Sequence, residues 1–135
     1  MKDTKTKKIL AAAVGAIASL ALGFAQSTTP AHVSPADAKN HIGEIAIICG
    51  KVVDTKVNKY GIAGHGKPVL FDLDHREPDV VFYFVTFGSK DGGPEEAIAA
   101  YKDRSVCVTG KIVLASGIPY IMAADRSNIK TKTGN

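Results

Sequence analysis

The sequence predicts a mainly β domain whose strands wrap into a small barrel. Two apolar, β-branched runs at 47–53 and 106–113 each contain a Gly-Lys pair near the middle and one cysteine. A glycine inside a strand marks a bulge or a sharp bend, as occurs where a small barrel turns a corner. Two such strands in one short chain therefore favour a curved, closing sheet over a flat one.

The length and composition indicate a single domain, since 135 residues with 45% hydrophobic content can bury one core. The formal charge of +4 is concentrated at the N-terminus, where Lys2, Lys5, Lys7 and Lys8 precede an uncharged apolar run at 9–24. This layout is typical of a secretory signal, with cleavage expected after Ala25. Cleavage leaves 13 basic and 12 acidic residues, so overall charge gives no argument for a polyanionic partner.

The competing interpretation of the apolar run is an uncleaved membrane anchor. Its length is at the short end of the roughly 17–25 residues that span a bilayer, and glycine and alanine dilute its hydrophobicity. We therefore predict a signal peptide (1–25), a tether (26–33), a folded domain (34–129) and a polar tail (130–135). The mature protein is expected in the periplasm or outside the cell, without a stable membrane anchor.

The first predicted element is a short helix at 35–41. Ser34 is a suitable N-cap, Pro35 fits the first helical position, and Gly43 ends the helix. A first strand at 44–54 and a glycine-rich loop at 55–67 follow. Alternation then predicts a second strand at 69–74, with Val69, Phe71 and Leu73 facing the core.

A third strand at 80–87 is apolar on both sides, so periodicity leaves open which side faces the core. One side carries Phe82, Phe84 and Thr86, and the other carries Val81, Tyr83, Val85 and Phe87. A second short helix at 95–101 begins after Pro94, with acidic residues in its first turn. Strands at 105–114 and 118–123 complete the domain, separated by the turn Ser116-Gly117.

This order of elements matches the five-stranded Greek-key barrel called the OB-fold, with one short N-terminal helix and another between strands three and four. An open barrel of five or six strands gives similar signals. Four motifs within about 34–129 also point to a known family: Cys49-Gly50-Lys51-Val52, Gly66-Lys67-Pro68-Val69-Leu70-Phe71, Val106-Cys107-Val108-Thr109-Gly110-Lys111-Ile112 and Gly117-Ile118-Pro119-Tyr120-Ile121. With these motifs the chain resembles small exported bacterial OB-fold proteins. Such domains also occur beside nucleases, and the wider nucleic-acid-binding OB-fold group is similar.

The two cysteines are candidates for a disulfide in an exported protein. The first and fourth strands of an OB-fold are neighbours, which allows Cys49 and Cys107 to lie opposite each other. The alternative is a pair of buried thiols that pack as small hydrophobic groups.

The function that the resemblance implies is weak, sequence-independent binding of single-stranded nucleic acid. Such sites combine aromatic platforms with basic groups that follow the strand. If Phe82 and Phe84 face inward, Tyr83 and Phe87 are the candidate platforms. The candidate phosphate contacts are Lys56, Lys59, His65, Lys67, Lys90 and Lys111. In the alternative interpretation the aromatic residues belong to the core and the lysines are solvated.

Asp72 and Asp74 oppose this function, because the same alternation places them on the outer face, where they repel phosphates. Related OB-fold proteins carry neutral groups there. The second candidate function is therefore a module that binds a protein, a glycan or a divalent cation through this acidic end. One version of this candidate is a divalent metal site. Its oxygen and imidazole ligands would come from Asp72, Asp74, His75 and Glu77.

The sequence gives no support for catalysis or for a cofactor. It has no glycine-flanked nucleophilic serine, no metal-binding histidine pair and no phosphate-cradling glycine loop. His41, near the end of the first helix, is interpreted as a packing or capping residue. A haem chaperone would need a histidine in the C-terminal region, and all four histidines lie at or before His75.

Overall fold

The structure, a computed structural model, describes residues 29–133 and is mainly β. Its elements are β1 (Ala31–Val33), η1 (Pro35–Asn40), β2 (Ile45–Val57), β3 (Pro68–Leu73), β4 (Tyr83–Phe87), α1 (Gly93–Tyr101), β5 (Ser105–Ala115), β6 (Ile118–Met122), η2 (Arg126–Asn128) and β7 (Ile129–Thr131). The predicted signal peptide (1–25) and cleavage site lie outside the described residues.

The prediction of a mainly β domain is confirmed, but the predicted count of five strands is wrong. The two additional strands, β1 and β7, have three residues each and lie at the two ends of the domain. β1 pairs in parallel with β2, and β7 pairs antiparallel with β5. Segments this short carry no measurable alternation, so only their pairing identifies them as strands.

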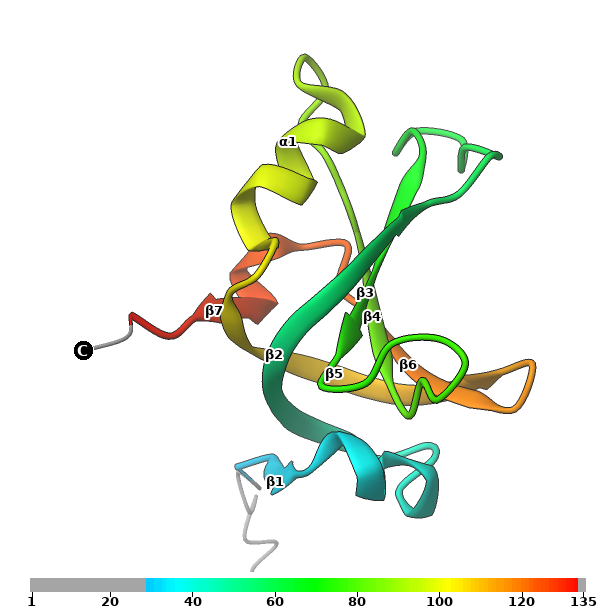
Figure 1. The fold of residues 1–135 in the computed structure, drawn as a ribbon, viewed down its shortest axis with the longest axis vertical. Coiled ribbons are helices and arrows are strands. Elements are labelled where there is room, and N and C mark those ends of the chain that lie inside the picture. Colours follow the sequence, from blue (N-terminus) through cyan, green and yellow to red (C-terminus); the bar gives the residue numbers. More distant parts are fainter. Residues whose placement is uncertain (1–28, 134–135) are drawn as a thin grey trace, which may run out of the picture.

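The other five strands follow one another around a partial ring. The sheet order is β1-β2-β3-β4-β6-β5-β7, and β2 also pairs with β5. All pairings within the ring are antiparallel except that between β4 and β6. Figure 1 shows the long strands β2 and β5 crossing, with α1, which connects β4 to β5, beyond one end of the sheet.

Both long strands change partners directly after their Gly-Lys pairs. β2 pairs with β5 as far as Lys51 and with β3 from Val52 onward. β5 pairs with β2 as far as Lys111 and with β6 from Ile112 onward. The bends expected at these two positions are therefore where the strands leave one partner for another.

The glycines at the two bends leave no room for a side chain. A Cβ atom on Gly110 would lie 2.6 Å from Cγ2 of Ile121. On Gly50 it would lie 3.0 Å from Oδ1 of Asp74, the oxygen that accepts a hydrogen bond from the Lys51 N–H at 2.8 Å. Close packing across the bend, rather than an unusual φ angle, requires glycine here.

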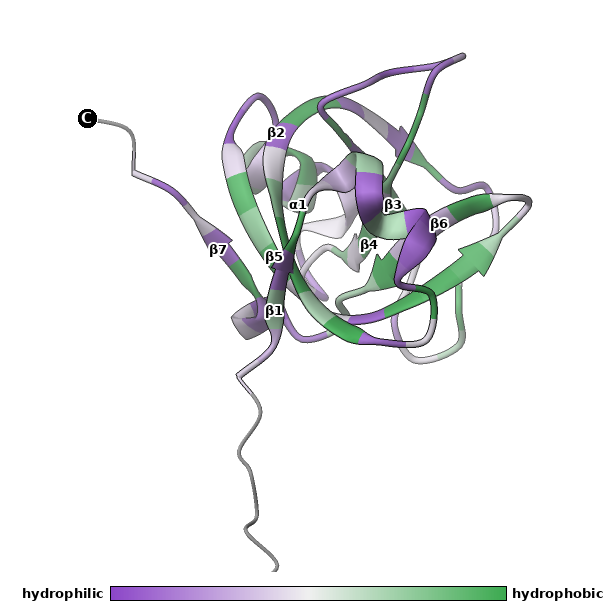
Figure 2. Cartoon of the chain, turned by 90° about the horizontal axis from the view of Figure 1, so that it is seen from below, coloured by the Kyte–Doolittle hydropathy of each residue, from purple (hydrophilic) through white to green (hydrophobic). Residues whose placement is uncertain are grey.

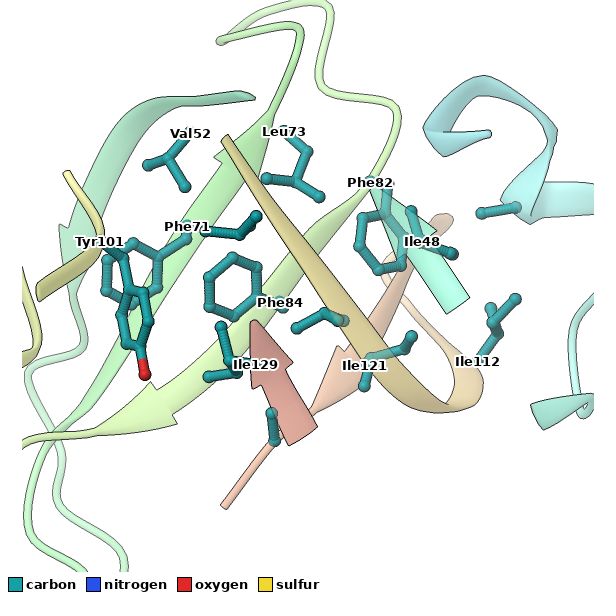
Figure 3. Packing of buried hydrophobic residues seen from close by; sticks show 14 of the residues in the cluster. Ile48, Val52, Phe71, Leu73, Phe82, Phe84, Tyr101, Ile112, Ile121 and Ile129 are labelled. Atoms are coloured by element: carbon teal, nitrogen blue, oxygen red, sulfur yellow. The ribbon is translucent and has the colours of Figure 1, made fainter. Parts of the chain in front are cut away.

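The inner face of the ring holds the core (Figure 3). The rings of Phe71 and Phe84 stack with centroids 4.8 Å apart, and Tyr101 of α1 meets Phe71 edge-on at 5.7 Å. The predicted inward residues of the second strand are all fully buried: Val69, Phe71 and Leu73. Phe82, Phe84 and Thr86 are also fully buried, which identifies their side of the third predicted strand as the inner one.

The connections are more polar than the strands that they join. Figure 2 shows hydrophobic residues along the strands and hydrophilic residues in several loops and in β7. Three large hydrophobic side chains in and beside the β2–β3 loop nevertheless remain exposed: Val57, Tyr60 and Ile62. Within residues 29–133, no helix has the length and apolar character needed to cross a membrane.

The two cysteines meet across the β2–β5 pairing. Cys49 and Cys107 are register partners, with Cα atoms 4.0 Å apart and sulfur atoms at the bonding distance of 2.07 Å. The bridge closes a loop with a sequence separation of 58 residues. It joins the two bent strands just before the bend in β2.

We expect Gly110→Ala to destabilise the fold by about 1–3 kcal/mol, because the added methyl group overlaps Cγ2 of Ile121. Ile121→Leu removes that branch, so the double variant should lose less stability than the sum of the single variants. Urea unfolding of the four proteins measures the coupling. Thr109→Ala on the same strand is the control, and an equal loss there would contradict the steric explanation.

We expect the double substitution Cys49→Ser and Cys107→Ser to lower the free energy of unfolding by about 4 kcal/mol, from the chain entropy of the closed loop. Urea unfolding with and without a reductant measures this loss. The reductant should shift the midpoint of the natural protein and leave the variant unchanged. Two free thiols in the denatured, unreduced protein would contradict the bridge.

Candidate functional site

The outer face of the sheet carries a stacked pair of tyrosines. Tyr83 of β4 is the register partner of Asp72 on β3 and of Tyr120 on β6. Because their chain neighbours Phe84 and Ile121 are fully buried, alternation directs both tyrosines outward. Their rings are 5.1 Å apart and nearly parallel, at 4°. The two half-buried rings therefore stack face to face and form one aromatic patch on the outside of the sheet.

One side of this surface is acidic. Asp54 of β2 is the register partner of Asp72 on β3, so two carboxyl groups lie on adjacent strands. Burial raises the pKa of Asp72 to about 6, and the Asp54 carboxylate adds to the rise. The ammonium of Lys56 donates a hydrogen bond to Glu77, which raises the pKa of Lys56. Lys56 is therefore engaged by a carboxylate and is less available for a phosphate.

A groove of about 780 Å³ lies at the Phe87 end of β4, away from the row formed by Asp72 and Tyr83. The groove lies between the β2–β3 loop and the loop that precedes α1, both at the top of the view in Figure 1. Its lining contains three basic side chains and one histidine, and none of its described residues is acidic. The lining residues are Gly64, His65, Gly66, Lys67, Phe87, Gly88, Ser89, Lys90, Gly93, Pro94, Ala124 and Arg126.

Phe87 is a wall of the groove rather than an open platform. It lies on the same side of β4 as Tyr83, as alternation requires, but only 7% of its surface is exposed. The imidazole of His65 stacks on it, with ring centroids 4.9 Å apart. His65 is itself exposed, so its free face is the aromatic surface that the loop offers to a ligand.

Arg126 lines the groove from η2 and is held by α1. Its Nη1 donates to Oε1 of Glu96 at 2.7 Å, and its guanidinium lies over the Tyr101 ring at 5.3 Å. The Arg126 bond and a hydrogen bond from the Ser89 N–H lower the pKa of Glu96. Nε and Nη2 of Arg126 are buried and have no hydrogen-bond acceptor among the described residues.

The structure divides the predicted nucleic-acid residues among several places. Four of them line the groove, namely His65, Lys67, Phe87 and Lys90, whereas Tyr83 and Lys56 lie at the acidic side. Lys59 lies in the β2–β3 loop outside the groove lining, and Lys111 lies at the bend of β5, opposite Ile45. The predicted residues therefore form no single cluster.

The residues of the predicted cation site also diverge. Asp74 has a positive φ of 66° and its carboxylate accepts from the backbone of Lys51, while Glu77 is paired with Lys56. In the part of the chain that the structure describes, no three His, Cys, Asp or Glu side chains gather closely enough to hold a metal ion.

Sequence reasoning missed two residues of this region, Tyr120 and Arg126. The alternation of Pro119, Tyr120 and Ile121 is visible in the sequence and places Tyr120 outward, but its partner Tyr83 follows only from the parallel pairing of β4 with β6. Arg126 lies in a segment without periodicity, and its contacts with α1 are long-range. No local signal identifies it.

No protein-family model and no curated protein matches this chain. A solved structure that does match is described as an aspartyl-tRNA synthetase from Leishmania major Friedlin, with 14% identity and a TM-score of 0.49. The match covers 82% of this chain and 22% of the synthetase chain.

We expect Asp72→Asn to stabilise the protein by about 1 kcal/mol at pH 7.5, after allowance for the solvent exposure of this half-buried group. The pKa of Asp72 rises from 3.8 to about 6 on folding. The stability penalty is therefore absent below pH 4 and complete above pH 6. Urea unfolding at several pH values measures the difference, which should vanish near pH 4.

The matched variant is Asp54→Asn, which removes the neighbouring carboxylate and should lower the pKa of Asp72. An NMR titration of the Asp72 carboxyl carbon measures this pKa in both proteins. An Asp72→Asn effect of the same size at pH 4 and pH 7.5 would show that ionisation is not its cause.

Proposed function

We propose that this protein is an exported OB-fold module that binds single-stranded nucleic acid. The OB-fold assignment is supported by the partial ring of five strands, the sheet order within it and the helix between β4 and β5. Export is supported by the cysteine pair at disulfide distance, because such bonds persist outside the cytosol.

One observation carries the binding proposal: a stacked aromatic pair and a basic groove lie at the two ends of β4, about 13 Å apart along the strand. Tyr83, Val85 and Phe87 point to the same side of β4, and Phe87 is part of the groove wall. A single strand needs π surfaces for its bases and cations for its phosphates. The tyrosine pair and His65 supply the first, and Lys67, Lys90 and Arg126 supply the second.

The acidic residues restrict where the phosphates run. Asp72 and Asp54 lie beside Tyr83, on the neighbouring strands β3 and β2, whereas the groove lies at the Phe87 end of β4. Lys56 pairs with Glu77 and leaves the two aspartates without an ion-pair partner among the described residues. A phosphate chain is repelled there and attracted to the groove. We therefore propose that bases rest on the tyrosines while the backbone runs along the groove side of the face.

The acidic side also supports the second candidate, recognition of a cationic partner through Asp54 and Asp72. These carboxyl groups lie on adjacent strands next to a half-buried tyrosine. Asp72→Asn separates the two functions. It should strengthen binding of a single strand by removing a repulsive charge, and it should weaken binding of a basic protein partner.

We expect Lys67→Ala to weaken binding of a fluorescein-labelled oligothymidylate and to reduce the salt dependence by about 0.7 in the slope of log K against log salt. Fluorescence anisotropy from low to moderate salt measures both. Lys102→Ala is the matched control, because Lys102 follows the far end of α1 and does not line the groove. No salt-dependent binding at low ionic strength would remove the proposal.

We expect Tyr83→Leu to weaken the same binding by about 5- to 150-fold, equivalent to the roughly 1–3 kcal/mol of one stacked base. Leucine keeps apolar bulk at a half-buried position, and circular dichroism verifies the fold. Tyr83→Phe keeps the ring and should retain most of the affinity. Equal losses for leucine and phenylalanine would contradict a stacking role.

A further inference from the structure

The groove beside α1 is lined by several basic side chains. Lys67, Lys90 and Arg126 line it together with His65, and its described lining contains no carboxylate. The chain as a whole is close to charge balance once the predicted signal is removed. Glu96 offsets the charge of Arg126, so the two lysines supply the excess positive charge of this concavity. Their charge raises the local concentration of an anion with more than one negative charge.

Lys67 and Lys90 have no ion-pair partner among the described residues, so their charges are available. Arg126 gives one nitrogen to Glu96 and leaves Nε and Nη2 without an acceptor. Buried donors without an acceptor are costly and rare in folded proteins.

The remaining lining suits a flat aromatic group. The exposed imidazole of His65 already stacks on Phe87 at 4.9 Å and offers its other face. Glycines at four lining positions keep the walls free of side chains, and the volume of about 780 Å³ is within the range of sites for small ligands. The groove thus combines a stacking surface with a multiply charged anion site.

We propose that this groove binds a nucleoside phosphate monoester, either the phosphorylated end of a single strand or a free mononucleotide. A monoester carries about −1.5 to −2 charge at pH 7 and three acceptor oxygens, whereas an internal diester carries a single charge. The monoester therefore matches the basic lining better. Binding of a phosphorylated strand end rests on the proposed function, whereas binding of a free mononucleotide does not depend on it.

The test compares oligothymidylates that carry a 5′-phosphate, a 3′-phosphate or no terminal phosphate, by fluorescence anisotropy at low salt. We expect one phosphorylated form to bind at least about fivefold more tightly than the unphosphorylated strand. Calorimetric titrations with thymidine monophosphate, thymidine and inorganic phosphate identify the recognised group. The monophosphate should bind more tightly than either of the other two.

Lys90→Gln removes one lining charge from an exposed loop and should abolish the preference for the phosphorylated end. Arg126→Gln should do the same, although it also breaks the bond to Glu96, so Lys90→Gln is the decisive variant. Lys102→Gln, with the same loss of charge beyond the far end of α1, should preserve the preference. A preference that survives Lys90→Gln would overturn the assignment to this groove.

The outcomes distinguish this inference from the proposed function. If all oligonucleotides bind equally and the monophosphate does not bind, the inference fails and strand binding stands. If no oligonucleotide binds while the monophosphate does, the proposed strand binding is wrong, and binding of a free mononucleotide in the groove is supported. If inorganic phosphate binds as well as the monophosphate, the nucleoside part of the inference is wrong.

Discussion

The structure depends on the close packing that bends β2 and β5. At Gly50 the Asp74 carboxylate occupies the space of a side chain, and at Gly110 the Ile121 methyl group does so. Each strand can therefore leave its first partner and pair with a second one. Without these two changes of partner, β2 could not pair with both β3 and β5, and the partial ring would open.

The ring determines where the functional groups lie. Its inner face is filled by Phe71, Phe84 and their neighbours, so the alternate residues of β4 and β6 must face outward. The parallel pairing of β4 with β6 then brings Tyr83 beside Tyr120. The loop that leads into β3 lies opposite the loop between β4 and α1, and the groove lies between them.

The outer face is divided by charge, so a nearly neutral domain carries both an acidic patch and a basic groove. The carboxylates of Asp54 and Asp72 lie on one side of the tyrosine pair, and Glu77 is paired with Lys56. The basic side chains that line the groove lie farther along the sheet, where β4 leads to α1. Net charge averages over these regions, whereas a bound strand responds to the local field.

The sequence by itself determined the local features: the helix cap at Ser34, the bends at the Gly-Lys pairs and the inward residues of β3. These follow from short-range geometry, which periodicity and glycine placement encode directly. Only the tertiary structure decided the strands β1 and β7, the covering of Phe87 by His65, the engagement of Lys56 by Glu77 and the position of Arg126. These features join residues far apart in the chain, and neither spacing nor composition specifies which distant side chain will lie beside which.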